Sequence, residues 1–253
     1  MIKLPRTLHI EGSRLPKGKT DPEAVEFNKL AGQFLVVEEK VDGTGVSLFF
    51  DKDWNLQIWH RGSPANSKEF YQLHRWAANY TNQLFDTLET RYALFGEWMH
   101  QKHTIFYDSL PHYFLESDIY DSKENVWLST KARNQLLTKC RPFMFSVPIE
   151  KAFKPTRLVD VTRLVTRPMY QSLHWRERLW KSCERFNLNL EEVLKQTDQS
   201  DLMEGLYIKH EDDQKVIGRY KYVRYEFVEN IINSGSHLRD RQPIPNLLSS
   251  EIF

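Results

Sequence analysis

The chain has 253 residues, of which 40% are hydrophobic and 27% charged, a composition typical of a globular protein rather than a disordered one. The formal net charge is only +1, so a cationic surface for an acidic partner has to be local. Two cysteines without metal-ligand spacing, unclustered histidines and no apolar stretch near the ~18 residues of a membrane span argue against disulfides, a zinc site and membrane insertion. We expect a cytoplasmic protein with no membrane partner.

The N-terminal third alternates between strand and helix patterns. The first thirty residues are rich in loop formers, with one short helix predicted around Pro22 to Leu30. Residues 34–50 predict two strands joined at the glycine-rich turn EEKVDGTG, and residues 55–63 predict the next strand of a meander. Residues 68–91 carry apolar side chains at three- and four-residue steps, which predicts an amphipathic helix.

The rest of the chain continues the mixture without an internal repeat. Strands are predicted at 92–98 and 113–121, helices at 129–139 and 172–196, and a hairpin from 204–212 and 215–224 around EDDQ. The whole reads as one α+β unit. We divide it into an N-terminal loop and helix segment (1–33) packing on the core, a main domain (34–224) and a short helical tail (225–253).

Lys40 lies between the two strands predicted in residues 34–50, where burying a charge is costly. A lysine on an exposed strand edge is the common explanation. Here Asp42 and two glycines predict a tight turn that fixes the direction of the side chain, and the flanking apolar strands predict partial desolvation. Desolvation and nearby cations lower the pKa of an amine and make it a nucleophile. Lys40 is therefore the candidate nucleophile.

Six segments, taken together and in order, resemble the motifs of the covalent nucleotidyltransferase superfamily of polynucleotide ligases and mRNA capping enzymes, and within it the ATP-dependent RNA ligases. Each segment alone is a weak signal, but their order is specific. They are EKVDG (39–43), HRGS (60–63), LFGEW (94–98), HYFLESDIYD (112–121), MEGLYIK (203–209) and GRYKYVR (218–224). The resemblance implies a nucleotidyltransferase (adenylation) domain of antiparallel sheets with flanking helices, followed by no OB-fold.

The resemblance also implies roles for individual residues. Lys40 attacks the α-phosphate of ATP and carries AMP covalently, with Lys221 and Glu204 as further catalytic residues, and the charge of Lys221 lowers the pKa of Lys40. Glu204 and Glu97 orient Mg2+ or Mn2+. Phe114 stacks on the nucleobase, with Tyr113 as second choice. The implied nucleotide-binding set is Glu39, Lys40, Arg61, Glu97, Phe114, Glu204, Arg219 and Lys221.

The implied function is joining of 5′-phosphate and 3′-hydroxyl RNA ends through lysyl-AMP and an adenylated 5′ end, with end-healing repair enzymes as expected partners. Arg219 departs from the lysine of many phage-type enzymes but keeps a fixed positive charge. The alternatives are a GTP-dependent capping-type guanylyltransferase and a non-catalytic nucleotide- or RNA-binding module.

Two further features carry no assigned role. Lys209 is interpreted as a solvated lysine, and Arg224 as an ordinary surface arginine unless it lines an RNA path. The tryptophans and cations of residues 174–186 suit a nucleic-acid-facing helix, although a helix packed by its tryptophans is the more common case.

Overall fold

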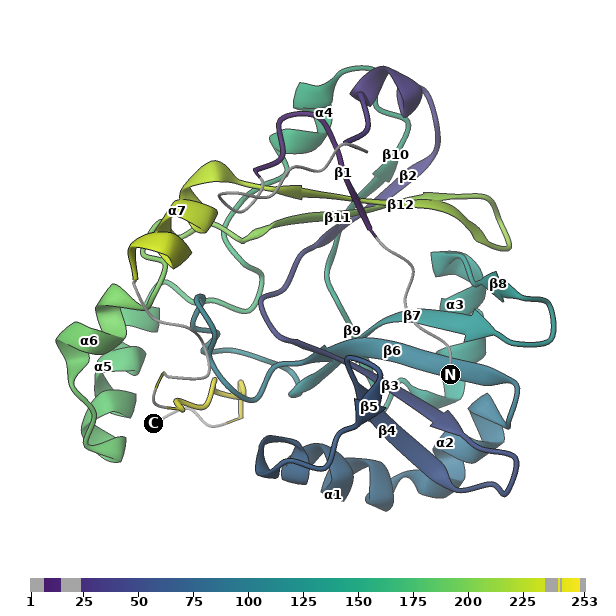
Figure 1. Cartoon of the computed structure of the whole chain (residues 1–253), viewed down its shortest axis with the longest axis horizontal. Coiled ribbons are helices and arrows are strands. Elements are labelled where there is room, and N and C mark those ends of the chain that lie inside the picture. The colour runs from purple at the N-terminus through teal and green to yellow at the C-terminus, as the bar shows by residue number, and fades with distance from the viewer. Residues whose placement is uncertain (1–6, 15–23, 235–240, 242, 251–253) are drawn as a thin grey trace.

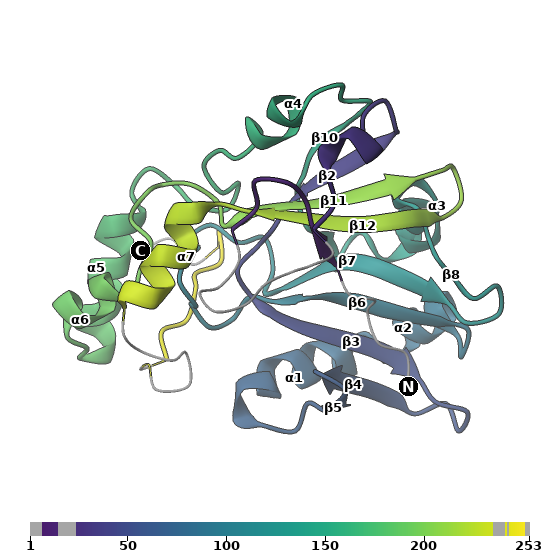
Figure 2. The same ribbon diagram turned by 45° about the horizontal axis from the view of Figure 1, so that its top comes forward.

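The computed structural model describes residues 7–14, 24–234, 241 and 243–250. Within these ranges two β-sheets lie one above the other, with helices on their outer faces and at one end (Figures 1 and 2). This arrangement confirms the predicted α+β class of antiparallel sheets with flanking helices. None of the helices in the described ranges combines the length and the apolar character that crossing a membrane requires. The division of the chain at residues 33 and 224 stays a prediction.

The upper sheet in Figure 1 has the strand order β1-β12-β11-β2-β10. Its strands are β1 (Leu8–His9), β2 (Leu35–Glu39), β10 (Ile149–Phe153), β11 (Gly205–Glu211) and β12 (Val216–Val223). The predicted hairpin of β11 and β12 is confirmed, while β1 was not predicted and pairs with β12 in parallel. All residues of β2 are buried, as a central strand covered on both faces requires.

The lower sheet has the order β5-β4-β3-β6-β7-β8, with β9 beside β7. Its strands are β3 (Thr44–Phe50), β4 (Leu56–His60), β5 (Ser63–Pro64), β6 (Tyr92–Trp98), β7 (Phe114–Asp121), β8 (Val126–Trp127) and β9 (Phe145–Ser146). The predicted meander of β3 and β4 is confirmed, as are the strands at β6 and β7.

The chain crosses from one sheet to the other between β2 and β3. The glycine-rich turn predicted there was expected to join two strands directly, but β2 pairs with β11 and β10, whereas β3 pairs with β4 and β6. At the crossing the Lys40 amide donates to the carbonyl of Gly205 in the upper sheet, and Thr44 already pairs with Trp98 in the lower sheet. Lys40 is therefore held between the two sheets.

The helix predicted over residues 68–91 is interrupted. It forms the 3-10 turn η2 (Lys68–Phe70), α1 (Tyr71–Asn79) and α2 (Thr81–Leu88), with a break at Tyr80. Weak helix formers stand on both sides of the break, and the Tyr80 ring stacks on Phe143 at 4.1 Å, which compensates for the interruption. Both helices cover the outer face of the lower sheet (Figure 2).

Of the remaining helices, α5 (Trp175–Phe186), α6 (Leu190–Lys195) and α7 (Tyr225–Asn233) lie at one end of the molecule, α4 (Leu158–Thr162) lies on the upper sheet, and α3 (Thr130–Leu136) lies beside β7 of the lower sheet (Figure 1). Residues 129–139 form α3 and η3 (Leu137–Cys140), residues 172–196 form α5 and α6, and the tail contains the predicted helix as α7. The short α4 was not predicted. The expected N-terminal helix is reduced to η1 (Phe27–Lys29), and its first two positions lie outside the described residues.

Candidate nucleotide site between the two sheets

Lys40 lies in the cleft between the sheets, where β2 ends. Its Nζ is 2.7 Å from Oε1 of Glu204, and only 19% of its side chain is exposed. The ring of Tyr207 lies 5.7 Å from the same amine. Glu204 is placed by the residue that follows it: a Cβ on Gly205 would stand 1.9 Å from the carbonyl oxygen of Tyr222, so only glycine lets β11 approach β12 this closely.

The charge of Lys40 differs from the expectation. Burial by itself lowers the pKa of the amine, but the carboxylates of Glu204 and Glu97, together with Tyr207, raise it above its ordinary value. The nearby Lys221 was expected to lower that pKa; in the structure its charge acts on Glu204. Lys40 is thus an ammonium ion, which has no lone pair for a nucleophilic attack until it loses a proton.

Two carboxylates share the space around Lys40. The pKa of Glu97 is raised to about 7: burial is the largest cause, Lys40 lowers the pKa, and Glu204 raises it. Burial likewise raises the pKa of Glu204. The described residues contain no group of three metal-ligating side chains. One or two carboxylates, completed by water and phosphate oxygens, are nevertheless the set on which Mg2+ is usually held, so Glu97 and Glu204 fit a hard divalent cation.

Glu39 carries an unsatisfied buried oxygen. Its Oε2 accepts a hydrogen bond from the amide of Met169 at 2.9 Å, while Oε1 is buried without a partner among the described residues. Burial raises the pKa of this carboxyl to about 8, against the opposing effect of the Met169 amide. An unpaired buried oxygen is costly to keep, so this position fits a residue that hydrogen-bonds a ligand.

Asp42 fixes the crossing on which Lys40 lies. Its Oδ2 accepts from the amides of Thr104 and Ile105 at 2.7 and 2.9 Å, and its own amide donates to the hydroxyl of Tyr107. Burial opposes the charge, but His103 and these amides outweigh it and lower the pKa of Asp42 to about 2. Asp42 is thus held by a loop distant in sequence, and the expected fixing of the Lys40 side chain by a tight turn at Asp42 stays a prediction.

The C-terminal segment supports the same loop. Asn246 is fully buried, accepts from the amide of Tyr107 and donates to the carbonyl of Met99, while its own carbonyl accepts from the Tyr113 hydroxyl. A continuous chain of hydrogen bonds therefore runs from Asn246 through Tyr107 to Asp42. Sequence reasoning missed Asn246, since an isolated asparagine in a predicted tail gives no signal.

A buried charge network fills the cleft deeper inside, and it corrects the interpretation of Lys209. This lysine is 2% exposed, and its Nζ lies 2.8 Å from Glu38 and 3.2 Å from Asp118. Arg133 pairs with the other oxygen of Glu38, and Arg219 lies 2.5 Å from Asp118. Lys209 thus joins strands of both sheets and is not a solvated lysine. The sequence did hold a signal for this burial. Lys209 follows Tyr207 by two positions, so the two side chains point to the same face of the strand.

The predicted phosphate ligands do not all lie in the cleft: Arg219 and Lys221 are on β12, whereas Arg61 is in a turn of the lower sheet. Arg219 lies inside the cleft, with its guanidinium 4.5 Å from the ring of Trp127 and one nitrogen buried without a partner among the described residues. Lys221, two positions further along the same strand, acts electrostatically on Glu204. Arg61 is exposed in the turn between β4 and β5, at a positive φ of 46°, and makes no ion pair with a described residue.

The Phe114 ring lies on the other face of the lower sheet. It is fully buried in the core under α1, 5.2 Å from the Trp76 ring. A cavity of about 20 Å3 between the sheets is lined instead by Glu38, Glu39, Val41, Glu97, Ser117, Asp118, Val147 and Tyr207. This volume is about that of one water molecule. The structure brings Lys40, Glu39, Glu97, Glu204 and Lys221 together, but not Phe114 or Arg61.

Arg224 also differs from its interpretation as a surface residue. It is 4% exposed, donates to the carbonyls of Met203 and Leu202 and pairs with Asp198. These contacts fix the chain just before Glu204. Arg224 therefore supports the site from behind and does not line an RNA path.

Comparison with known proteins gives a family and a fold. A family model described as RNA ligase matches residues 33–223. Among curated proteins no match is found. The fold is similar to solved structures of the Naegleria gruberi RNA ligase: the form with PPi is 16% identical with a TM-score of 0.53, covering 90% of this chain and 63% of that one.

Two mutant forms of the same ligase match comparably. One with ATP and Mn is 14% identical with a TM-score of 0.54, covering 81% of this chain and 53% of that one. Another with AMP and Mn is 16% identical with a TM-score of 0.53, covering 88% and 61%. At these identities the similarity establishes the fold, which is the predicted adenylation fold. The chain spans between half and two thirds of the length of these ligases.

Proposed function

The chain belongs to the RNA ligase family, and on this basis we propose that it is an ATP-dependent RNA ligase that joins 5′-phosphate and 3′-hydroxyl ends through an adenylate on Lys40. The observation that carries the proposal is the ion pair of Lys40 with Glu204 in a cleft, beside a second carboxylate with a raised pKa. The Naegleria gruberi structures with ATP and with AMP support ATP as the nucleotide.

In the first step the Lys40 amine attacks the α-phosphorus of ATP, a P–N bond forms, and the P–O bond to the β-phosphate breaks to release pyrophosphate. Lys40 first has to release to solvent the proton that Glu204 stabilises, so that the neutral amine attacks. A nucleotide that draws Glu204 away from the amine removes this stabilisation. A divalent cation held by Glu204 and Glu97 would neutralise phosphate charge, and Mn with the similar ligases supports such an ion.

The other residues bind and orient the nucleotide in this proposal. Glu39 Oε1, buried without a partner among the described residues, hydrogen-bonds the base. Lys221 and Arg219 supply positive charge to the phosphates from one strand face. Stacking by Phe114 remains a prediction, and it requires the ring to leave the core. Arg61 remains a phosphate or ribose ligand that acts from an exposed turn.

In the second step an oxygen of the RNA 5′-phosphate attacks the adenylate phosphorus and Lys40 leaves. In the third the 3′-hydroxyl attacks the activated 5′-phosphate, its proton passes to solvent, the phosphodiester bond forms, and the bond to AMP breaks. Charge neutralisation and positioning supply most of the rate in phosphoryl transfer. The fixed cleft charges meet this need, and end-healing enzymes that prepare such ends are the expected partners.

The test is covalent labelling. Protein incubated with α-32P-labelled ATP and Mg2+ should retain label under denaturation, and Lys40→Ala should not. Lys40→Arg should also fail, because a guanidinium has no free lone pair at working pH. Lys131→Ala is the control, since Lys131 is an exposed lysine. Labelling by GTP instead of ATP would favour a guanylyltransferase, and no labelling by either would favour a non-catalytic module.

The RNA assignment has a separate test. Nicked duplexes that differ only in the sugars at the 3′-hydroxyl end should be sealed faster with ribose than with deoxyribose, since the 2′-hydroxyl distinguishes RNA from DNA. Equal or faster sealing of the all-DNA nick would overturn the RNA preference and leave the adenylation chemistry intact.

A further inference from the structure

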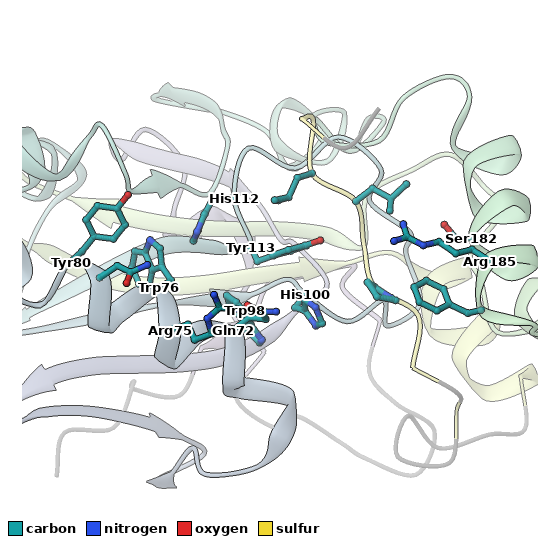
Figure 3. A pocket seen from close by; sticks show the side chains of 15 residues that line it. Gln72, Arg75, Trp76, Tyr80, Trp98, His100, His112, Tyr113, Ser182 and Arg185 are labelled. Carbon is teal, nitrogen blue, oxygen red and sulfur yellow. The ribbon is translucent and has the colours of Figure 1, made fainter. Parts of the chain in front are cut away.

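A second, larger cavity lies on the other side of the lower sheet from Lys40. Its volume is about 520 Å3, within the range of sites that bind small organic groups. Trp98 lines it, whereas Glu97, the preceding residue of β6, lines the cleft, because successive side chains of a strand point to opposite faces. Side chains from α1 and from α5 border it on two sides (Figure 3).

The walls of this outer pocket offer flat aromatic surfaces. The His100 ring lies 5.9 Å from Trp98 at an interplanar angle of 13°, and Tyr113 meets His100 edge-on at 4.9 Å. Phe186, the last residue of α5, also lines the pocket and is 42% exposed. Aromatic faces of this kind stack on nucleobases irrespective of sequence.

Cations border the same surfaces. Arg75 from α1 and Arg185 from α5 are exposed side chains that line the pocket (Figure 3). They come from the two helices on its opposite sides, so a chain passing between the helices meets a positive charge from each. A guanidinium matches a phosphate in geometry and charge.

The wall of the outer pocket also contains hydrogen-bond donors. Trp76 and Ser182 line the pocket, are 8% and 1% exposed, and carry a ring nitrogen and a hydroxyl with no partner among the described residues. His112 also lines the pocket, and its Nδ1 lies 3.0 Å from the amide nitrogen and 3.3 Å from the carbonyl oxygen of Phe114. Unsatisfied donors beside aromatic faces indicate a polar, planar ligand.

We propose that the outer pocket binds a nucleobase and its phosphate from the single-stranded part of the RNA substrate. This rests on the proposed ligase function and adds a contact to it. The two sites lie on opposite faces of β6, and the chain that follows this strand borders both: His100 lines the outer pocket, and His103 contacts Asp42 behind Lys40. An RNA strand with its end at Lys40 reaches the pocket by passing around this end of the sheet.

The experiment measures binding of a fluorescein-labelled single-stranded RNA of about twelve nucleotides by anisotropy, in EDTA so that no chemistry occurs. Phe186→Ala should weaken binding about 5- to 160-fold, which corresponds to the roughly 1–3 kcal/mol lost with one base stack. Trp180→Ala is the matched control: Trp180 lies on the same helix, is 44% exposed and does not line the pocket. It should change the dissociation constant less than twofold.

Further measurements distinguish an RNA-binding pocket from a site for free mononucleotides, and they test whether the variants are folded. AMP that binds wild type as tightly as the RNA does, and that binds Phe186→Ala only weakly, would overturn the proposal in favour of a free-mononucleotide site. Equal affinities of Phe186→Ala and Trp180→Ala would also overturn it. Arg185→Glu should weaken RNA binding as well, and both pocket variants should keep wild-type melting temperatures and labelling by ATP. Loss of labelling in wild type would refute the ligase function without touching the RNA-binding result.

Discussion

Replacing Lys209 by methionine removes one charge from the buried network between the sheets. The Nζ of Lys209 lies 2.8 Å from Glu38 and 3.2 Å from Asp118, and it donates to the carbonyl of Ser117 at 2.7 Å. Methionine fills a similar volume, so the change acts through charge and hydrogen bonding rather than through a cavity.

The loss of folding free energy in Lys209→Met depends on the positive charges that remain next to Glu38 and Asp118. Removing one partner of a buried ion pair typically costs about 3–5 kcal/mol, because the other charge is left without compensation. Glu38 keeps Arg133 at 2.9 Å and Asp118 keeps Arg219 at 2.5 Å, which places Lys209→Met at the lower end, about 3 kcal/mol. For a chain of this size that lowers the melting temperature by about 6–12 °C.

Urea unfolding at pH 7, followed by tryptophan fluorescence, measures the change. The control is Lys131→Met, which breaks an ion pair of Lys131 and Asp213 at 2.7 Å whose side chains are 59% and 79% exposed. Exposed pairs contribute about 0–1 kcal/mol, so this variant should unfold almost like wild type. If Lys209→Met costs no more than Lys131→Met, Lys209 is solvated and the network does not join the sheets.

Three further predictions concern the site and its support. Asp42→Asn should lower the free energy of unfolding by about 2 kcal/mol above pH 4, because the pKa of Asp42 is lowered to about 2; the difference from wild type should shrink as the pH falls through 4 to 2, and a constant difference in acid urea titrations would contradict it. Asn246→Ala should cost about 2–5 kcal/mol by leaving two buried backbone groups unpaired, and should slow labelling by ATP; unchanged labelling in a destabilised variant would show that the tail only stabilises the fold. Glu97→Ala, Glu204→Ala and Lys221→Ala should each lose most ligation while melting within a few degrees of wild type, and a collapse of all three melting temperatures would make them structural.

The sequence by itself determined the family and most of the local elements. Six segments in a fixed order indicated the RNA ligases, and the family match over residues 33–223 confirms this. The strands around Lys40, Glu97 and Glu204 were predictable, because alternation of apolar side chains and turn residues is a local property.

The tertiary structure decided which strands share a sheet and which charges are buried. No local pattern separates a glycine-rich hairpin from the crossing that places Lys40 between two sheets, since the difference lies in partners far along the chain. The burial of Lys209 depends on Glu38 and Asp118, which come from strands of both sheets. The raised pKa of Lys40 likewise follows from Glu204, a carboxylate that only folding brings within 2.7 Å, because electrostatic energy depends on distance in space and not in sequence.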